Sequence, residues 1–265
     1  MDDRPVLVDI DPYGVATVRL NRPHRNNAYN GDMMEALLEG VKSLSADDSV
    51  RIIVLRGNGK YFQAGADLKW MNSLATQSVE KNFAMSQTTT DAVRLLNACP
   101  KPTIALVHGG CFGGGLGMMA ACDIVIASRE AVFSITEVRW GLVAGPIIPQ
   151  LVDAMGLPAL RRYALTGETF SAAKAVDYGL VHELCETGAL DEAADGIIDA
   201  LLKNSPSAIS QTKEIMLRVG GHLVDDFEAP EFAKVHAERR RTEDAIEGLS
   251  SFNQRREASW YPKKK

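Results

Sequence analysis

Residues 103–117 read TIALVHGGCFGGGLG, and this stretch contributes most to the expected fold. Thr103–Val107 is almost entirely apolar, which predicts a buried strand. The next ten residues, 108–117, are rich in glycine, and the apolar run 116–122 predicts a helix. Glycine allows backbone amides to approach a ligand closely. The junction between strand and helix is therefore a candidate binding site.

Two common glycine-rich motifs are excluded here. No lysine follows the glycines, so the stretch is not a P-loop. The spacing of Gly110 and Gly113 also differs from the dinucleotide-binding fingerprint of doubly wound folds. His108, at the end of the predicted strand, has two interpretations: a general base, or a structural residue that closes the strand.

On either side of this stretch the pattern of apolar residues changes along the chain. The first half alternates predicted strands at 6–10, 14–20, 52–55, 103–107, 123–127 and 132–134 with predicted helices at 31–44 and 79–98. After Pro146 the pattern becomes almost continuously helical, with predicted helices at 146–155, 158–165, 171–178, 190–202, 206–217, 230–241 and 242–255. We therefore expect an α/β protein in which residues 1–200 form the core that carries the site. Residues 201–265 are expected to form a helical C-terminal region.

Composition excludes several function classes. The chain has 265 residues, of which 46% are hydrophobic and 24% charged, as in ordinary globular proteins. A net charge of −5 argues against a chain-wide nucleic-acid-binding surface. The chain lacks an apolar signal region and any run of about 18 apolar residues, so neither export nor a membrane partner is expected. Its four cysteines form no C-x-x-C pair, which favours the reducing cytoplasm and predicts no metal site.

Two further segments carry candidate chemistry. Residues 61–70, YFQAGADLKW, predict a helix that begins at Asp67, and free amides at such a start can stabilise an oxyanion, although small residues there also serve packing. Residues 133–146, FSITEVRWGLVAGP, place Glu137 in a mostly apolar stretch. Burial would raise the pKa of its carboxyl and suit it to carry protons. The alternative is an ion pair between Glu137 and Arg139 or another basic residue.

In this order and spacing, the three segments resemble the enoyl-CoA hydratase/isomerase (crotonase) family over nearly the whole chain. Further matching motifs are Asn21-Arg22-Pro23 with Asn27-Ala28, Arg161–Gly167, Glu247-Gly248, and Phe252 with Arg255-Arg256. The resemblance implies a spiral of ββα units with a helical C-terminal trimerisation region, and hence a homotrimer or homohexamer. Apolar residues in that region, such as Leu217, Phe227 and Phe232, are consistent with such an assembly.

The resemblance also implies the substrate and the site. The substrate is an acyl-CoA thioester; no cofactor is expected, because coenzyme A is part of the substrate. The backbone amides of Ala66 and Gly114 are expected to bind the thioester oxygen, and Glu137 to act as the catalytic acid–base group. The expected substrate-binding residues are Arg25, Ala28, Ala64, Asp67, Leu68, Phe112, Gly113, Thr136, Gly145, Arg255 and Arg256. Among these, Arg25, Arg255 and Arg256 are candidates for the CoA phosphates, since arginine binds phosphate with paired hydrogen bonds.

One position departs from the family's two-carboxylate hydratases. Their second Glu stands three residues after the middle glycine, where this chain has Gly117. A single carboxylate is sufficient for double-bond isomerisation, which needs one proton moved between two carbons. The wider sequence, including 66–71 and 136–143, is most similar to the methylglutaconyl-CoA and isohexenylglutaconyl-CoA hydratase branch, which favours hydration of a branched or glutaconyl-type enoyl-CoA. Isomerisation remains the alternative, and a catalytically silent CoA-ester-binding scaffold is a third.

Overall fold

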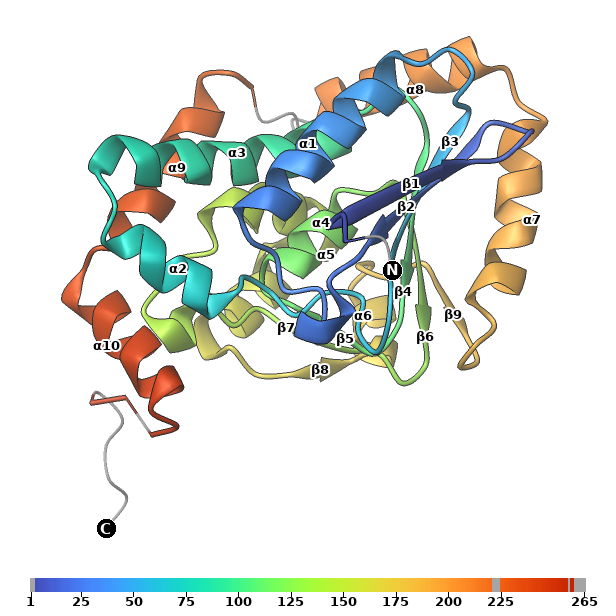
Figure 1. Ribbon diagram of the computed structural model, residues 1–265. Helices are drawn as coiled ribbons and strands as arrows, with labels where there is room; N and C mark the ends of the chain where they lie inside the picture. The colour runs from blue at the N-terminus through green and yellow to red at the C-terminus, as the bar shows by residue number, and fades with distance from the viewer. Residues whose placement is uncertain (1–2, 221–224, 257, 260–265) are drawn as a thin grey trace.

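A six-stranded sheet runs through the centre of the protein in the computed structural model, which describes residues 3–220, 225–256 and 258–259 (Figure 1). Its strands, in spatial order, are β1 (Val6–Ile10), β2 (Val15–Leu20), β3 (Ile52–Gly57), β4 (Thr103–Val107), β6 (Ile124–Ser128) and β9 (Glu183–Cys185). β1 and β2 form the predicted antiparallel hairpin, with Val6 opposite Leu20. All other neighbouring strands in this sheet are parallel.

Both faces of this sheet are covered by helices. Ile53 and Leu55 of β3 point into the main core with α1 (Gly31–Ala46) and α3 (Val79–Asn97). Their neighbours on β3, Ile52 and Val54, face α7 (Leu190–Leu202) on the opposite side (Figure 1). Side chains alternate between the faces of a strand, so a strand buried on both sides is apolar without interruption.

A smaller sheet lies beside the first and consists of β5 (Gly110–Phe112), β7 (Val132–Ser134) and β8 (Phe170–Ser171). β5 follows β4 after a two-residue break and then leads into α4 (Gly114–Ala120). The sequence predicted that α4 starts at Leu116, and this boundary is wrong. The helix begins two residues earlier because Gly113 adopts a positive φ of 51° and turns the chain directly into it.

The second half of the chain is mainly helical, as predicted, but it also contains the short strands β8 and β9, which the sequence did not indicate. It contains α5 (Ile148–Thr166), α6 (Ala172–Asp177), α7, α8 (Pro206–Gly220), α9 (Glu228–Arg239) and α10 (Glu243–Asn253). The two helices predicted within 146–165 are the two halves of α5, which is interrupted by Gly156 at φ 71°. The α/β class with C-terminal helices is therefore confirmed, whereas the division at residue 200 stays a prediction and its last residues, 260–265, lie outside the described ones.

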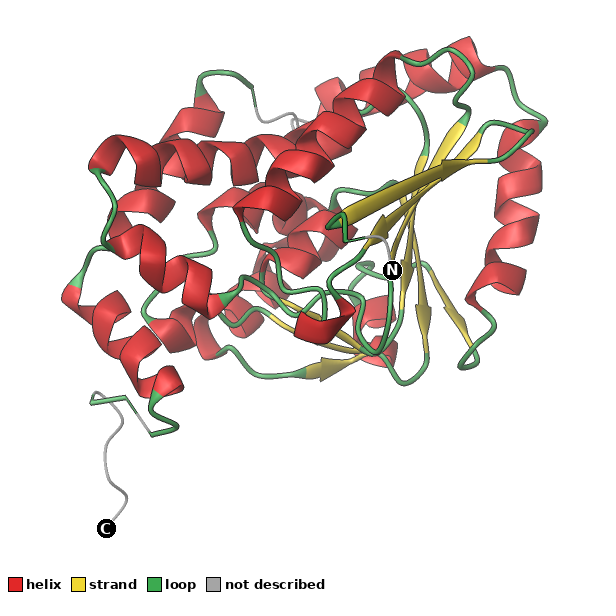
Figure 2. Ribbon diagram, in the orientation of Figure 1, coloured by secondary structure: helices red, strands yellow, loops and turns green. Residues whose placement is uncertain are grey.

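The last two helices, α9 and α10, lie at the end of the molecule away from the six-stranded sheet, whereas α8 lies near the sheet (Figure 1). Figure 2 shows α9 and α10 grouped there with α2 (Leu68–Ala75) and the end of α3. α9 packs along α3, and α10 packs against α2 and the short 3-10 helix η2 (Glu137–Trp140). In the described part of the chain, no helix has the length and hydropathy required to cross a bilayer.

Candidate active site

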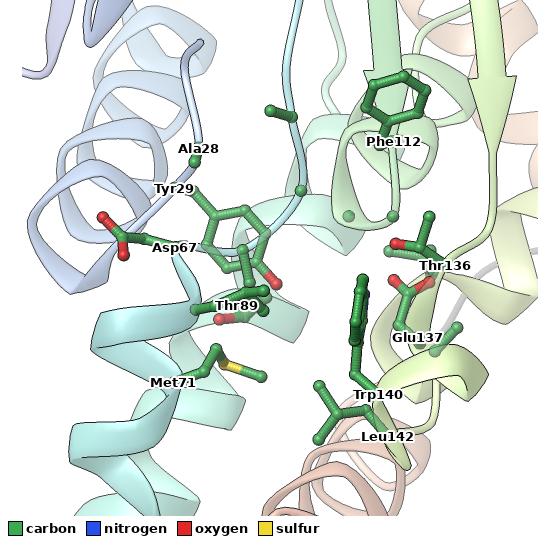
Figure 3. Close-up of a pocket in the computed structure, with 18 of the residues that line it drawn as sticks. Ala28, Tyr29, Asp67, Met71, Thr89, Phe112, Thr136, Glu137, Trp140 and Leu142 are labelled. Carbon is green, nitrogen blue, oxygen red and sulfur yellow. The ribbon is translucent and has the colours of Figure 1, made fainter. Parts of the chain in front are cut away.

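A cavity of about 390 Å³ lies between the glycine-rich strand ends and the C-terminal helices (Figure 3). All three segments singled out from the sequence contribute to its lining. In Figure 3, Tyr29 and Thr89 lie on one side of the cavity, and Thr136 and Glu137 lie across from them. The cavity is thus formed by residues from the first, middle and last parts of the chain.

Backbone hydrogen bonds hold the first two segments side by side. The amide of Gln63 donates to the Gly110 carbonyl at 3.2 Å, and the amide of Phe112 donates to the Gln63 carbonyl at 2.9 Å. The Gln63 side chain also fixes the following turn, since its Oε1 accepts from the Gly65 amide at 2.6 Å. A side chain on Gly115 would come within 2.5 Å of that Oε1 atom, so the contact requires glycine.

The amide of Ala66 is directed away from its neighbouring chain segment. Tyr29 donates its amide to the Gly65 carbonyl at 2.9 Å, and its carbonyl accepts from the Asp67 amide at 2.8 Å. Amides alternate in direction along an extended backbone, so the Ala66 N–H points to the opposite side. No acceptor among the described residues takes this hydrogen, which leaves it available to a ligand.

The amide of Gly114 is the second free donor at the cavity. Gly114 is the first residue of α4, where backbone amides have no partner within the helix. The preceding amide, of Gly113, is used in a 2.9 Å hydrogen bond to the Ser134 carbonyl, whereas the Gly114 amide has no acceptor in the described chain. A Cβ on Gly114 would approach the Tyr29 ring to 2.6 Å, so the close packing of Tyr29 against the start of α4 requires glycine here.

Glu137 places a carboxyl group beside these donors. Its Oε2 atom is buried and has no hydrogen-bond partner in the part of the chain that the structure describes, although the residue as a whole is partly exposed. Burial raises the pKa of Glu137 to about 7, against a smaller lowering effect of the backbone amides of Glu137 and Thr136. A Cβ atom added to Gly113 would lie 3.0 Å from Oε1 of Glu137, so the carboxyl group lies at the start of α4. Near neutral pH this group can both accept and release a proton.

The arrangement decides between the two interpretations of Glu137 and of His108. Glu137 makes no ion pair with Arg139 or any other described cation; the Arg139 side chain lies against Gly167 instead. His108 is bonded through Nε2 to the Gly59 carbonyl at 2.8 Å and does not line the cavity, which agrees with a structural role.

Comparison with known proteins identifies the family. Residues 11–263 match the family model described as enoyl-CoA hydratase/isomerase. The chain belongs to the enoyl-CoA hydratase/isomerase family. A solved enoyl-CoA hydratase from Shewanella pealeana is similar, with 35% identity, a TM-score of 0.79, and coverage of 97% of this chain and 96% of that one.

Relatives in this family differ in the reaction they are named for. A mevalonyl-coenzyme A hydratase of Aspergillus fumigatus is 31% identical over 97% of this chain and 95% of its own length. A peroxisomal Δ(3,5)-Δ(2,4)-dienoyl-CoA isomerase of Arabidopsis thaliana is 33% identical over 75% of this chain and 76% of its own. Membership in the enoyl-CoA hydratase/isomerase family therefore leaves hydration and isomerisation both open.

Most residues predicted for the enoyl-CoA hydratase/isomerase site meet at the cavity. Those in its lining are Arg25, Ala28, Ala64, Ala66, Asp67, Leu68, Phe112, Gly113, Gly114, Thr136 and Glu137. Three others lie outside the lining. Gly145 faces the Phe232 carbonyl, which a Cβ would approach to 3.1 Å. Arg255 and Arg256 follow α10, and Arg256 is paired with Glu247 at 2.6 Å.

The sequence did not indicate several other lining residues. These are mainly apolar or aromatic and come from separate elements: Tyr29, Met71, Thr89, Trp140, Leu142, Ile147, His236 and Phe252. Tyr29 is the most notable, because burial, followed by the Glu137 charge, raises the pKa of its hydroxyl and keeps it protonated. Trp140 and Phe252 close one side with an edge-to-face contact, their ring centroids 4.8 Å apart. Only its position two residues after Asn27 could have drawn attention to Tyr29.

The position of the missing second acid is filled by an apolar group. A Cβ on Gly117 would lie 2.0 Å from Cγ2 of Ile147, a residue of the 3-10 helix η3 (Gly145–Ile147) that lines the cavity. Ile147 therefore occupies space that a side chain at residue 117 would need.

Proposed function

We propose that this protein is a hydratase that adds water across the α,β double bond of an acyl-CoA thioester. One observation supports it most directly: the carboxyl of Glu137, whose Oε2 atom has no hydrogen-bond partner among the described residues, shares a cavity with two free amide donors, those of Ala66 and Gly114. The donors suit the thioester oxygen, and the carboxyl suits the proton transfers that hydration needs.

The proposed mechanism begins with the thioester carbonyl. Hydrogen bonds from Ala66 and Gly114 draw electron density to the carbonyl oxygen and make the β-carbon electrophilic. Glu137 takes a proton from water while the water oxygen bonds to the β-carbon, and the α,β π electrons form the enolate. Glu137 then gives the proton to the α-carbon as the carbonyl re-forms. One water is consumed, and Glu137 ends as it began.

This mechanism uses no group beyond the substrate and residues of the chain itself. A Glu137 pKa of about 7 means that the carboxylate and the acid are both accessible at neutral pH. We further propose that Arg25 contacts the CoA portion, because it is one of two cationic residues of the lining, with Lys69, and its carbonyl accepts from the Ala28 amide at 2.9 Å. The resemblance of the sequence to glutaconyl-CoA hydratases leads us to propose a branched or glutaconyl-type acyl group. We also propose a homotrimer or homohexamer, because the family resemblance implies a helical C-terminal trimerisation region.

A second candidate is double-bond isomerisation. It is favoured by the apolar Ile147 beside Gly117, which leaves Glu137 as the carboxyl group facing the reacting carbons among the described residues. In that reaction Glu137 removes a proton from one carbon next to the double bond and returns it two carbons away. The product then has the same mass as the substrate.

Substitution of Glu137 by Gln tests these proposals. The amide keeps the shape but cannot exchange the proton, so we expect kcat to fall about 10²- to 10⁴-fold while CoA-ester binding persists. Product mass distinguishes the reactions: hydration adds one water, and isomerisation leaves the mass unchanged. Glu214→Gln, an exposed position on α8, is the matched control. Full activity of Glu137→Gln would refute the role of Glu137, and no turnover by wild type of any enoyl-CoA ester would indicate a silent scaffold.

A further inference from the structure

Arg240, at the C-terminal end of α9, is a buried cation without an anionic partner. The residue has 0% exposure, yet no carboxylate in the described chain pairs with it. Burial lowers the pKa of its guanidinium to about 10, so it still carries a charge near neutral pH. Buried charges in proteins are usually paired, because leaving water is costly without a counter-charge.

One edge of the guanidinium is held by neutral acceptors. Its Nε donates to Asn82 Oδ1 at 2.8 Å, and its Nη2 donates to the Asn82 carbonyl at 2.9 Å and to Ser86 Oγ at 2.6 Å. Asn82 is oriented in turn, since its Nδ2 donates to the Ala237 carbonyl at 2.7 Å. These bonds fix the direction of the guanidinium without neutralising it.

Among the described residues, the remaining nitrogen, Nη1, has only weak partners, and both belong to the cavity lining. Met71 Sδ lies 3.9 Å away and His236 Nδ1 lies 3.4 Å away. A thioether is a weak acceptor, and a 3.4 Å separation is long for a nitrogen pair. The free bonding capacity of Arg240 is therefore directed to the wall between Met71 and His236.

His236 adds a second donor at this wall. Burial, and then the Arg240 charge, lowers the pKa of His236 well below its ordinary value, so the imidazole is neutral. Arginine has no acceptor atom, so Nδ1 must accept from Arg240, and the single proton sits on Nε2. No described residue accepts a hydrogen bond from Nε2, although His236 lines the cavity.

We propose that Arg240 and His236 form a subsite for a carboxylate at the far end of the acyl group. This subsite would narrow the acyl group proposed above to its glutaconyl-type option, an enoyl-CoA thioester of a dicarboxylic acid, and would assign the residues that bind the free carboxylate. Such a carboxylate supplies the missing counter-charge and accepts from Arg240 Nη1 and His236 Nε2, while the flexible Met71 side chain moves aside. This rests on the proposed function to the extent that the cavity binds an acyl-CoA thioester.

Binding of saturated thioesters tests the subsite without any turnover. Glutaryl-CoA and pentanoyl-CoA have acyl chains of equal length and differ in a terminal carboxylate or methyl group. We expect wild type to bind glutaryl-CoA more tightly by about tenfold or more in calorimetry, the range of a hydrogen bond to a charged group. Arg240→Met should abolish that preference, and Arg240→Lys should keep part of it.

Lys213→Met is the matched control, because Lys213 is also a buried cation but is paired with Asp123 at 2.7 Å. It should keep the wild-type preference. Should Arg240→Met not fold, as judged by circular dichroism, His236→Leu replaces it and should reduce the preference. Equal binding of the two thioesters by wild type, or an unchanged preference in Arg240→Met, would overturn the subsite. If wild type prefers glutaryl-CoA to pentanoyl-CoA but neither hydrates nor isomerises any enoyl-CoA ester, only the proposed reaction is refuted.

Discussion

At the scale of single residues, the catalytic role proposed for Glu137 comes with a cost in stability. Its raised pKa, about 7, means that the folded protein holds a proton that the unfolded chain releases near its ordinary pKa of 4.5. Between these values the folded state binds more protons, so stability falls as pH rises through this window. The titration of Glu137 changes the free energy of unfolding by at most about 3 kcal/mol.

Glu137→Gln removes this titration. We therefore expect the variant to gain stability relative to wild type between pH 5 and pH 8, because only wild type must ionise a buried carboxyl. Urea unfolding of both proteins at the two pH values measures the difference. An identical difference at pH 5 and pH 8 would contradict a raised pKa for Glu137.

Gly117 is a second residue whose role depends on its immediate neighbour. A side chain there meets Ile147 Cγ2 at 2.0 Å, so Gly117→Glu alone is expected to lose about 1–3 kcal/mol of stability from overpacking. Combining it with Ile147→Ala provides space for the carboxylate. The double variant should recover stability and hydrate crotonyl-CoA faster than Ile147→Ala alone. A single variant as stable as wild type in thermal unfolding would show that the contact relaxes without cost.

At the scale of elements, segments with a local apolar pattern were predictable, including the three-residue β7, whereas β5 and β8 were not. The strand Thr103–Val107 and the helix Leu190–Leu202 have the predicted bounds, because each is an apolar pattern that extends over its whole length. β5 and β8 have three and two residues, and their existence depends on pairing with β7 from elsewhere in the chain. Such pairing leaves no local periodicity in the sequence.

The start of α2 shows an element that positions the site. Asp67 Oδ1 accepts from the amides of Lys69 and Trp70 at 3.0 and 3.4 Å, and its Oδ2 pairs with Arg22 at 3.1 Å. Figure 3 shows the Asp67 carboxylate directed away from the cavity, so its role is to fix the backbone that carries the Ala66 amide. The sequence identified Asp67 as the helix start, but its link to Arg22 required the fold.

Replacing Asp67 tests this positioning. Asp67→Ala removes both the cap and the ion pair, and we expect a loss of about 1 kcal/mol or more in stability. The kcat should fall more than KM rises, because the Ala66 amide acts on the developing oxyanion. Asp67→Asn keeps the cap and is the control that should retain most activity. Unchanged kcat in Asp67→Ala would mean that the amide is positioned by Tyr29 alone.

At the scale of the whole molecule, parts of the site depend on how the C-terminal helices dock. His236 and Arg240 lie on or next to α9, while Asn82 and Ser86 lie on α3, more than 150 residues earlier in the chain. In the sequence each of these residues is an ordinary polar residue of a helix. Their meeting requires α9 to pack along α3, and no local pattern encodes that contact.

The same C-terminal region leaves apolar side chains exposed in the single chain. Val219 is 80% exposed and Phe227 is 87% exposed, and Met216 lies one turn before Val219 on α8. Burying such residues between copies is favourable. Since the family resemblance implies a homotrimer or homohexamer, we predict a mass of three or six times 28.8 kDa in sedimentation at micromolar concentration. Met216→Glu with Val219→Glu should weaken the assembly, whereas Tyr13→Glu, an exposed position in the β1–β2 turn, should not. Sedimentation of wild type at 28.8 kDa would rule the assembly out.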